Sequence, residues 1–342
     1  MKTLKVLLLS DGKPGHTTQT LGLVGYIKKK FTLEDDVIEV KPRIKIANRL
    51  LCILLNKNIR YAMLFFNWFY KSKKSGILSH KPDLIISTGG NTCGANAVLA
   101  KKFGCKNLFL GSLRGHDPQL FTGIITTTPM PGVDNSIVLD VAPTLIDQGK
   151  LQEAAKEFFD KQKILSSENL WVMLIGGEGS GYYYSREDYE ALANAMLLLA
   201  KKNNIRWLLT TSRRTGLENE KVLQTLFQEK DEIAYAVYFN QNPEKIMQAF
   251  LGAGEMVFCT EDSTSMVSEA VVSQKAVFTL RGTTKNPNKG HLAVIDRFAK
   301  HDHIHRLTIQ ELATLSPKEM EHRVINVEKN YDKILDLVTL SA

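Results

Sequence analysis

Acidic and basic side chains gather beside glycines near the start of this sequence. The segment Ser10–Gln19 places Asp11 and His16 close to Gly12 and Gly15. Imidazoles exchange protons near neutral pH, so His16 is a candidate general base, and Asp11 is the other candidate. The glycines would let backbone N–H groups approach an anion at the N-terminus of a following helix, which we expect to begin near Thr18. The alternative is a tight turn in which His16 only caps that helix.

A second glycine-rich segment, Gly176–Gly181, has four glycines in six positions and follows an apolar run. Successive backbone N–H groups in such a loop can form a concave anion site. Gly176, Gly177 and Ser180 are therefore candidate contacts for a phosphate or a sugar. The alternative is a flexible loop. Neither segment matches the dinucleotide fingerprint or the P-loop pattern.

Two adjacent arginines, Arg213 and Arg214, lie in the segment Thr210–Thr215 after another apolar run. A guanidinium group binds phosphate oxygens in pairs, which makes these residues candidates for neutralising a phosphate. The alternative is surface salt bridging.

The most informative segment is Thr260–Ala270, where hydroxyl and acidic side chains open a predicted helix near Ser263. Free N–H groups and hydroxyls at a helix N-terminus suit a diphosphate. Glu269 comes two turns later, where its carboxylate could accept hydrogen bonds from a ribose diol. The alternative is an ordinary N-cap followed by a surface acid. The candidate diphosphate contacts are Asp262, Ser263, Thr264 and Ser265.

These segments each follow a short apolar run, and such runs alternate with helical patterns along the chain. This alternation predicts βαβ units and parallel sheets buried on both faces. Ligands of such sheets bind at the carboxyl ends of the strands. The predicted strands are residues 5–9, 36–40, 84–87, 108–110, 123–126, 137–139, 171–175, 207–209, 234–238, 256–258 and 276–280.

The strands form two series, which predicts two doubly wound Rossmann-like domains facing a cleft. We place them at residues 1–150 and 165–315, with a C-terminal helix in 316–342 that packs back on the first domain. The helical stretch Thr144–Leu170 is predicted to be the linker. Asn242-Pro243 predicts a helix start, because it sets a cap residue before proline at the first helical position.

Composition is that of an ordinary globular protein of 342 residues, with 23% charged and 44% hydrophobic residues. The four cysteines are far apart and form no CxxC motif, which argues against a disulfide framework or a thiolate zinc site. The start, MKTLKVLLLS, is better explained as a first strand than as a signal peptide. We therefore expect a cytoplasmic protein.

The net charge of +8 is concentrated in one stretch: Val40–His116 contains 14 Lys and Arg residues and a single acid, Asp83. No nucleic-acid-binding motif accompanies this charge, so we expect no nucleic-acid partner. The segment Leu50–Tyr70 combines basic, aromatic and aliphatic residues, as an interfacial helix does. An anionic membrane surface is thus a candidate partner, with attachment at the inner face of a membrane. The alternative is that these apolar residues belong to the core.

Anion sites at strand ends in both halves, with a ribose-binding glutamate in the second, are typical of the GT-B glycosyltransferase architecture. The sequence also resembles the plant mitochondrial-fission "elongated mitochondria" family and its bacterial relatives. The resemblance extends from about Val6 to about Lys300. It is carried by DGKPGHTTQTLGL (Asp11–Leu23), PDLIISTGG (Pro82–Gly90), GSLR (Gly111–Arg114), TTSRRT (Thr210–Thr215) and TEDSTSMVSEA (Thr260–Ala270).

This resemblance implies a GT-B fold and a nucleotide sugar as donor, with Glu269 on the ribose and Ser263–Ser265 on the diphosphate. Arg213 or Arg214 would neutralise the leaving group, and neither a cofactor nor a metal would be needed. The leading hypothesis is a glycosyltransferase acting on a lipid-linked or envelope acceptor. A nucleotide-sugar epimerase is one alternative. The other is a non-catalytic membrane-associated adaptor, because plant members of the family act in organelle division and a fold does not determine activity.

Overall fold

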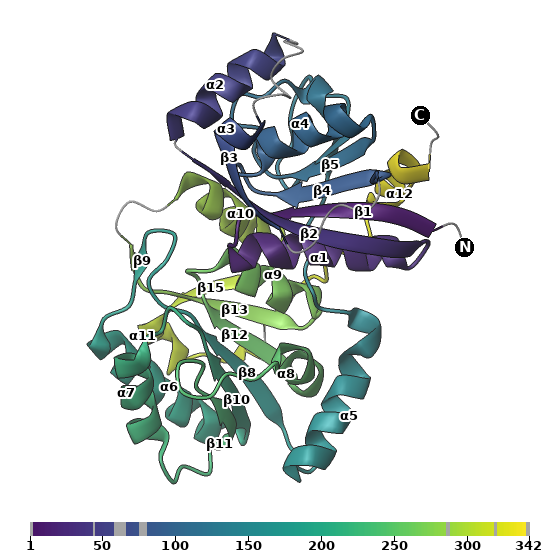
Figure 1. The fold of residues 1–342 in the computed structure, drawn as a ribbon. Coiled ribbons are helices and arrows are strands. Elements are labelled where there is room, and N and C mark those ends of the chain that lie inside the picture. Colours follow the sequence, from purple (N-terminus) through teal and green to yellow (C-terminus); the bar gives the residue numbers. More distant parts are fainter. Residues whose placement is uncertain are drawn as a thin grey trace. The chain divides into compact units, whose positions relative to one another are not determined.

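All eleven predicted strands are present in the computed structural model, within two largely parallel sheets. The structure describes residues 3–43, 45–57, 66–74, 81–284, 288–317 and 320–339. The chain divides into two units (Figure 1). The first unit contains Met1–Leu145 with Asn326–Ala342, and the second contains Ile146–Ile325.

The first unit is built on a seven-stranded sheet of order β3-β2-β1-β4-β5-β6-β7. Its neighbouring strands pair in parallel except β3, which is antiparallel to β2. The strands are β1 (Thr3–Ser10), β2 (Thr32–Pro42), β3 (Tyr70–Lys74), β4 (Leu84–Thr88), β5 (Lys106–Leu110), β6 (Gly123–Thr126) and β7 (Ser136–Val138).

Helices cover both faces of this sheet, which explains why its central strands are apolar throughout. One face packs on α2 (Lys45–Asn56), α3 (Phe66–Phe69) and α4 (Cys93–Phe103). The other packs on α1 (Pro14–Lys28) and on the C-terminal helix α12 (Tyr331–Thr339). The C-terminal helix thus belongs to the core of the first unit.

The second unit has a six-stranded parallel sheet of order β11-β10-β8-β12-β13-β15 and a short antiparallel pair, β9 and β14. Its large core cluster joins one face of the sheet to α6, α7 and α11. The strands are β8 (Leu170–Ile175), β9 (Tyr182–Tyr183), β10 (Arg206–Thr211), β11 (Ile233–Val237), β12 (Met256–Thr260), β13 (Ala276–Arg281), β14 (Thr283–Thr284) and β15 (His305–Thr308). The helices are α5 (Leu151–Gln162), α6 (Arg186–Asn203), α7 (Leu217–Phe227), α8 (Met247–Ala253), α9 (Thr264–Val272), α10 (Lys289–Lys300) and α11 (Ile309–Leu312).

Two local predictions differ from the structure. The stretch predicted as a linker forms α5, whose Phe158 packs edge-on against Phe250 of α8 in the core of the second unit. The helix predicted from Asn242-Pro243 begins only at Met247. A proline fixes its own backbone angle but supplies no N–H, so it permits a helix start without enforcing one.

Both sheets reverse their strand order at one place. In the first sheet β1 and β4 are neighbours, and the chain proceeds outward from them in opposite directions. In the second sheet β8 and β12 have this relation. The loops that leave such a pair diverge and form a crevice at the carboxyl ends of the strands. Three of the four predicted segments follow β1, β8 and β12, and the fourth follows β10, next to β8.

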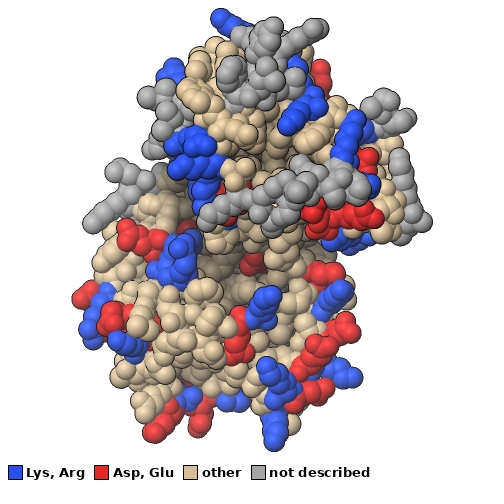
Figure 2. Space-filling model, in the orientation of Figure 1, with Lys and Arg blue, Asp and Glu red and all other residues tan. Residues whose placement is uncertain are grey.

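The surface charge of the second unit is mixed. On the face seen in Figure 2, its Lys and Arg side chains lie among Asp and Glu without an extended area of one sign. Among the described residues, no helix is both long and apolar enough to cross a membrane.

Candidate functional site

Asp11 and His16 form a hydrogen-bonded pair at the strand reversal of the first unit. Asp11 follows β1 and is buried, and its Oδ1 lies 3.0 Å from Nδ1 of His16. A carboxylate only accepts hydrogen bonds, so Nδ1 donates, and in the neutral imidazole Nε2 keeps its lone pair. Within the described residues Nε2 has no hydrogen-bond partner. This arrangement fixes the tautomer that a general base requires.

The loop after β4 holds this pair in place. Asn91 Nδ2 donates to the second oxygen of Asp11 at 3.0 Å. Gly89 has φ of +90°, and a Cβ at that position would overlap the His16 imidazole. A buried hydrogen bond of 2.8 Å between the Thr20 and Thr88 hydroxyls joins α1 to the end of β4. The strand reversal therefore brings Asn91 onto the carboxylate of Asp11, which lies 80 positions earlier in the chain.

The first segment differs in one detail from its prediction as a loop before a helix near Thr18. Helix α1 begins at Pro14, so Gly15 and His16 lie in its first turn. Proline is well suited to the first helical position because its missing N–H would be unpaired there. Gly12 remains in the loop with φ of +77°, and its N–H donates to the Ser10 hydroxyl at 3.1 Å.

Asp262 is the central acid of the strand reversal in the second unit. It follows β12 and is 1% exposed. Its Oδ1 accepts from the Thr260 hydroxyl at 2.7 Å, and its Oδ2 accepts from Nε of Arg214 at 3.1 Å. Asp262 and Arg214 thus engage each other, whereas the exposed Arg213 has no ion pair among the described residues.

Glycines are required where these loops approach one another. A Cβ at Gly176 would overlap the Asp262 carboxylate, and one at Gly177 would overlap the backbone carbonyl of Arg214. These contacts explain both glycines without a ligand. Ser180 lies in a turn with φ of +52°, and its carbonyl accepts from Asn288 N–H at 2.9 Å.

The N-terminus of α9 presents unpaired N–H groups. Ser263 is the N-cap, and its hydroxyl accepts from Met266 N–H at 3.4 Å. The backbone N–H groups of Thr264 and Ser265 have no partner within the described part of the chain. Both residues are partly exposed. They could therefore donate to an anion that reaches this helix end.

Glu269 lies on α9 and is partly buried. Burial alone raises the pKa of its carboxyl group from 4.5 to about 7. Its carboxylate makes no hydrogen bond or ion pair with the described residues. A buried carboxyl group without a protein partner is a candidate binding group, since a ligand hydroxyl could satisfy it.

One buried network near this site was missed in the sequence. Glu261, fully buried beside Asp262, accepts from Nε of Arg306 at 2.7 Å and from the Tyr182 hydroxyl at 3.0 Å. It therefore links the loop after β12 to β9 and β15. Its neighbour Asp262 was found because it precedes hydroxyl residues, but no local signal connects Glu261 to Arg306, 45 positions away.

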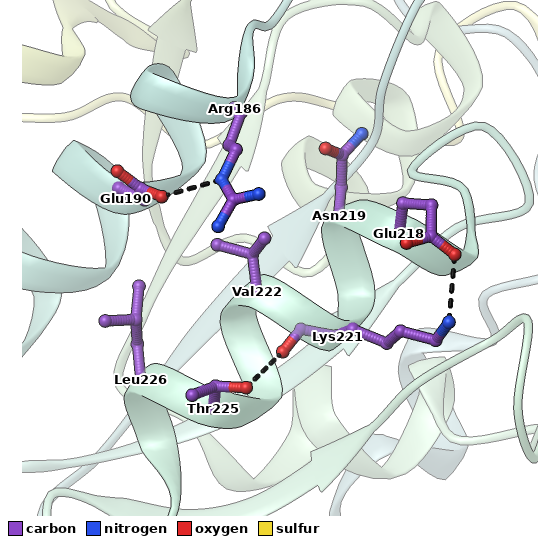
Figure 3. A pocket seen from close by; sticks show the side chains of 8 residues that line it. All are labelled: Arg186, Glu190, Glu218, Asn219, Lys221, Val222, Thr225 and Leu226. Carbon is purple, nitrogen blue, oxygen red and sulfur yellow. Dashed lines mark hydrogen bonds and ion pairs between the residues drawn. The ribbon is translucent and has the colours of Figure 1, made fainter.

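A surface depression of about 300 Å³ on the second unit lies between α6 and α7. Its lining includes none of the predicted site residues, and its charges are internally paired, Arg186 with Glu190 and Lys221 with Glu218 (Figure 3). Among the residues that the structure describes, no cluster of His, Cys, Asp or Glu is arranged to hold a metal ion.

Two doubly wound domains, each with polar loops at its strand reversal, define a protein of the GT-B class. Solved structures agree with this fold. The UDP-GlcNAc 2-epimerase of Methanocaldococcus jannaschii is similar with a TM-score of 0.59 and 12% identity, over 99% of each chain. The Neisseria meningitidis UDP-GlcNAc 2-epimerase bound to UDP-GlcNAc gives 0.58 and 13%, again over 99% of each chain. MurG of Acinetobacter baumannii gives 0.55 and 13%, over 98% of this chain and 99% of that one.

The model of the family described as mitochondrial fission ELM1 matches residues 14–325. The chain therefore belongs to this family, as its motifs predicted. A search of curated protein sequences found no relative.

Proposed function

We propose that this protein is a nucleotide-sugar-dependent glycosyltransferase. The observation that carries the proposal is the Asp11–His16 pair, which leaves a basic imidazole nitrogen free at the strand reversal of the first unit. A protein that only has this fold, or that only binds a nucleotide, does not need a general base. The inversion of an anomeric centre does, because the attacking hydroxyl must lose its proton.

In the proposed reaction, Nε2 of His16 accepts the proton of an acceptor hydroxyl. The oxygen forms a bond to the anomeric carbon, and the bond from that carbon to the diphosphate breaks. The electron pair leaves with the nucleoside diphosphate. Asp11 stabilises the imidazolium ion that forms, as the carboxylate of a catalytic triad does.

The donor would bind the second unit. Thr264 and Ser265 N–H at the start of α9 would donate to the diphosphate, and Glu269 would accept from the ribose hydroxyls. The exposed Arg213 would offset the charge of the leaving group, with Arg214 held nearby by Asp262. A helix dipole and cationic side chains can stabilise a departing diphosphate, so we propose a reaction without a metal.

The acceptor is proposed to be lipid-linked, since exposed apolar residues of the first unit lie among basic ones. Leu50, Ile53 and Trp68 are 41%, 47% and 59% exposed. Residues 58–65 of the predicted Leu50–Tyr70 surface lie outside the described residues. We propose that the described part of this surface rests on anionic lipid.

Nucleotide binding tests the donor site. Thermal unfolding would be followed with UDP, GDP, ADP and CMP, for the wild type, Glu269→Ala and the control Glu157→Ala. Glu157 is an exposed residue of α5. A nucleotide at 100 times its dissociation constant adds about 2.7 kcal/mol, or roughly 5–10 °C. We expect one nucleotide to stabilise the wild type and the control but not Glu269→Ala.

Product analysis tests the chemistry. Incubation with the matching nucleotide sugar should release free nucleoside diphosphate as the sugar is slowly transferred to water, and His16→Gln should abolish the release. A new epimer without free diphosphate would instead indicate an epimerase. Stabilisation by none of the nucleotides, together with an unchanged nucleotide sugar, would favour the non-catalytic adaptor.

A further inference from the structure

The cationic side chain of Arg114 and the His16 imidazole lie against neighbouring residues of the first unit. Gly89 and Gly90 are consecutive residues at the end of β4. A Cβ at Gly89 would overlap the His16 imidazole, and a Cβ at Gly90 would overlap the guanidinium group of Arg114. Consecutive Cα atoms are about 3.8 Å apart. The side chains of His16 and Arg114 therefore pack against the same short piece of backbone.

Arg114 is held in an uncommon conformation by its loop. Its φ is +49°, in the left-handed region that costs a non-glycine residue free energy. Asn56 clamps the loop from both sides: its Nδ2 donates to the Gly115 carbonyl at 2.8 Å, and its Oδ1 accepts from Asp117 N–H at 2.9 Å. His116 Nδ1 adds a bond of 2.8 Å to the Leu113 carbonyl. These hydrogen bonds fix the conformation of the loop that carries the Arg114 guanidinium group.

The charge of Arg114 is not neutralised by any residue that the structure describes. Its side chain is exposed and forms no ion pair with any described residue. The backbone N–H groups of Gly90 and Asn91, just before α4, likewise have no partner in the described part of the chain. A guanidinium group and free backbone N–H groups in the turn before a helix can together bind phosphate.

We propose that Arg114 binds a phosphate group of the acceptor, so that the acceptor is a phosphorylated molecule whose hydroxyl faces His16. This inference rests on the proposed transferase function and names the substrate class of its first-unit site. The anion would lie over Gly90, and the reacting hydroxyl would lie next to it over Gly89. Arg114 would then determine which acceptors are used.

A titration of the full chain with inorganic phosphate tests this, with the ring-proton NMR signal of His16 as the readout. The signal is assigned by its loss in His16→Gln. We compare the wild type with Arg114→Gln, Arg114→Lys and the control Lys30→Gln, which removes a charge from an exposed position of the same unit. Phosphate should shift the signal in the wild type and in Lys30→Gln with equal affinity. Arg114→Gln should weaken binding at least about tenfold, and Arg114→Lys should weaken it less.

Phosphate that shifts the signal equally in Arg114→Gln would overturn the assignment, and so would the absence of any shift in the wild type. Acetate serves as the second anion. If it binds as tightly as phosphate, the site does not select phosphate and the proposal fails. No nucleotide enters this titration, so its failure leaves the test of the donor site untouched.

Discussion

The ionised form of Glu269 lowers the stability of the folded protein. Its carboxyl group is partly buried and has no polar partner among the described residues, and its pKa is raised to about 7. The folded state therefore favours the protonated form. The stability that this group contributes is present below about pH 4.5 and is lost as the pH rises through about 7.

Glu269→Gln should stabilise the second unit at pH 8. Glutamine keeps the shape of the side chain and removes the titration, so we expect a gain of about 1–3 kcal/mol that declines toward pH 4.5. Urea unfolding followed by tryptophan fluorescence measures it, because Trp171 and Trp207 are fully buried in this unit. Glu157→Gln, at an exposed position of α5, is the control for replacing a carboxylate by an amide. A gain that does not vary with pH would contradict the raised pKa.

At the scale of single residues, the sequence identified the groups that stand next to strand ends. Asp11 and His16 were found because a strand, a glycine turn and a helix follow one another within a few positions. Asn91 and Arg114 were not found as partners, since their contacts with Asp11 and Gly90 depend on the order of strands in the sheet. Such order is a property of tertiary structure and is not encoded in local spacing.

The loop after β8 contains glycines that are needed for packing against neighbouring loops, whether or not they also contact a ligand. Gly177 allows the Arg214 backbone to pass within contact distance, and Gly176 leaves room for the Asp262 carboxylate. These approaches bring the loops that follow β8, β10 and β12 into one cluster. A larger residue at Gly177 would have to displace backbone atoms and not only a flexible side chain.

Gly177→Ala should destabilise the second unit by about 1–3 kcal/mol, as added methyl groups do in packed positions. It should also displace Arg214 and reduce the stabilisation by nucleotide. Urea unfolding with tryptophan fluorescence gives the first effect, and thermal unfolding with nucleotide gives the second. As a control, Gly25→Ala adds a methyl group with nothing within 4 Å in α1, and circular dichroism should show no loss of stability. If Gly177→Ala were as stable as the wild type, the close approach of the loops after β8 and β10 would not be needed for stability.

Two features of the fold, strand β3 and the packing of helix α5, could not be predicted from the sequence for physical reasons. The edge strand β3 contains Lys71, Lys73 and Lys74, so it lacks the apolar pattern of a buried strand. Edge strands commonly carry such lysines. The helical character of α5 agrees with the sequence, but its position between the two strand series predicts a linker, whereas its apolar face packs on α8. The central strands were predictable because both of their faces are buried and their sequences are apolar throughout.

At the scale of the whole molecule, the stretch Val40–His116 of the first unit carries an excess of positive charge. On the face seen in Figure 2, the second unit carries both signs. Among the described residues, the exposed apolar side chains Leu50, Ile53 and Trp68 lie in this basic stretch. Phe69, by contrast, is 2% exposed and belongs to the core. The proposed membrane surface thus uses only part of the apolar run.

Vesicles containing phosphatidylserine should bind the protein, and binding should weaken as salt screens the basic residues. Replacing Ile53 and Trp68 together by serine should weaken binding about tenfold or more, because two apolar side chains no longer enter the lipid. Vesicle sedimentation measures the bound fraction. Leu198→Ser is the control, since Leu198 is equally exposed but lies on α6 of the second unit. Equal losses in both variants would argue against a defined surface.

The return of α12 to the first unit sets an order for biosynthesis. Tyr331 stacks on Tyr26 with ring centroids 4.0 Å apart, and Lys106 Nζ donates to the Leu337 carbonyl at 2.8 Å. These contacts span most of the chain, whereas the second unit is one continuous segment. At a translation rate of about 5–20 residues per second, the first unit waits roughly 10–40 s for its last helix. The second unit can therefore complete its fold before the first, and during that interval the emerging first unit exposes the apolar face that α12 later covers.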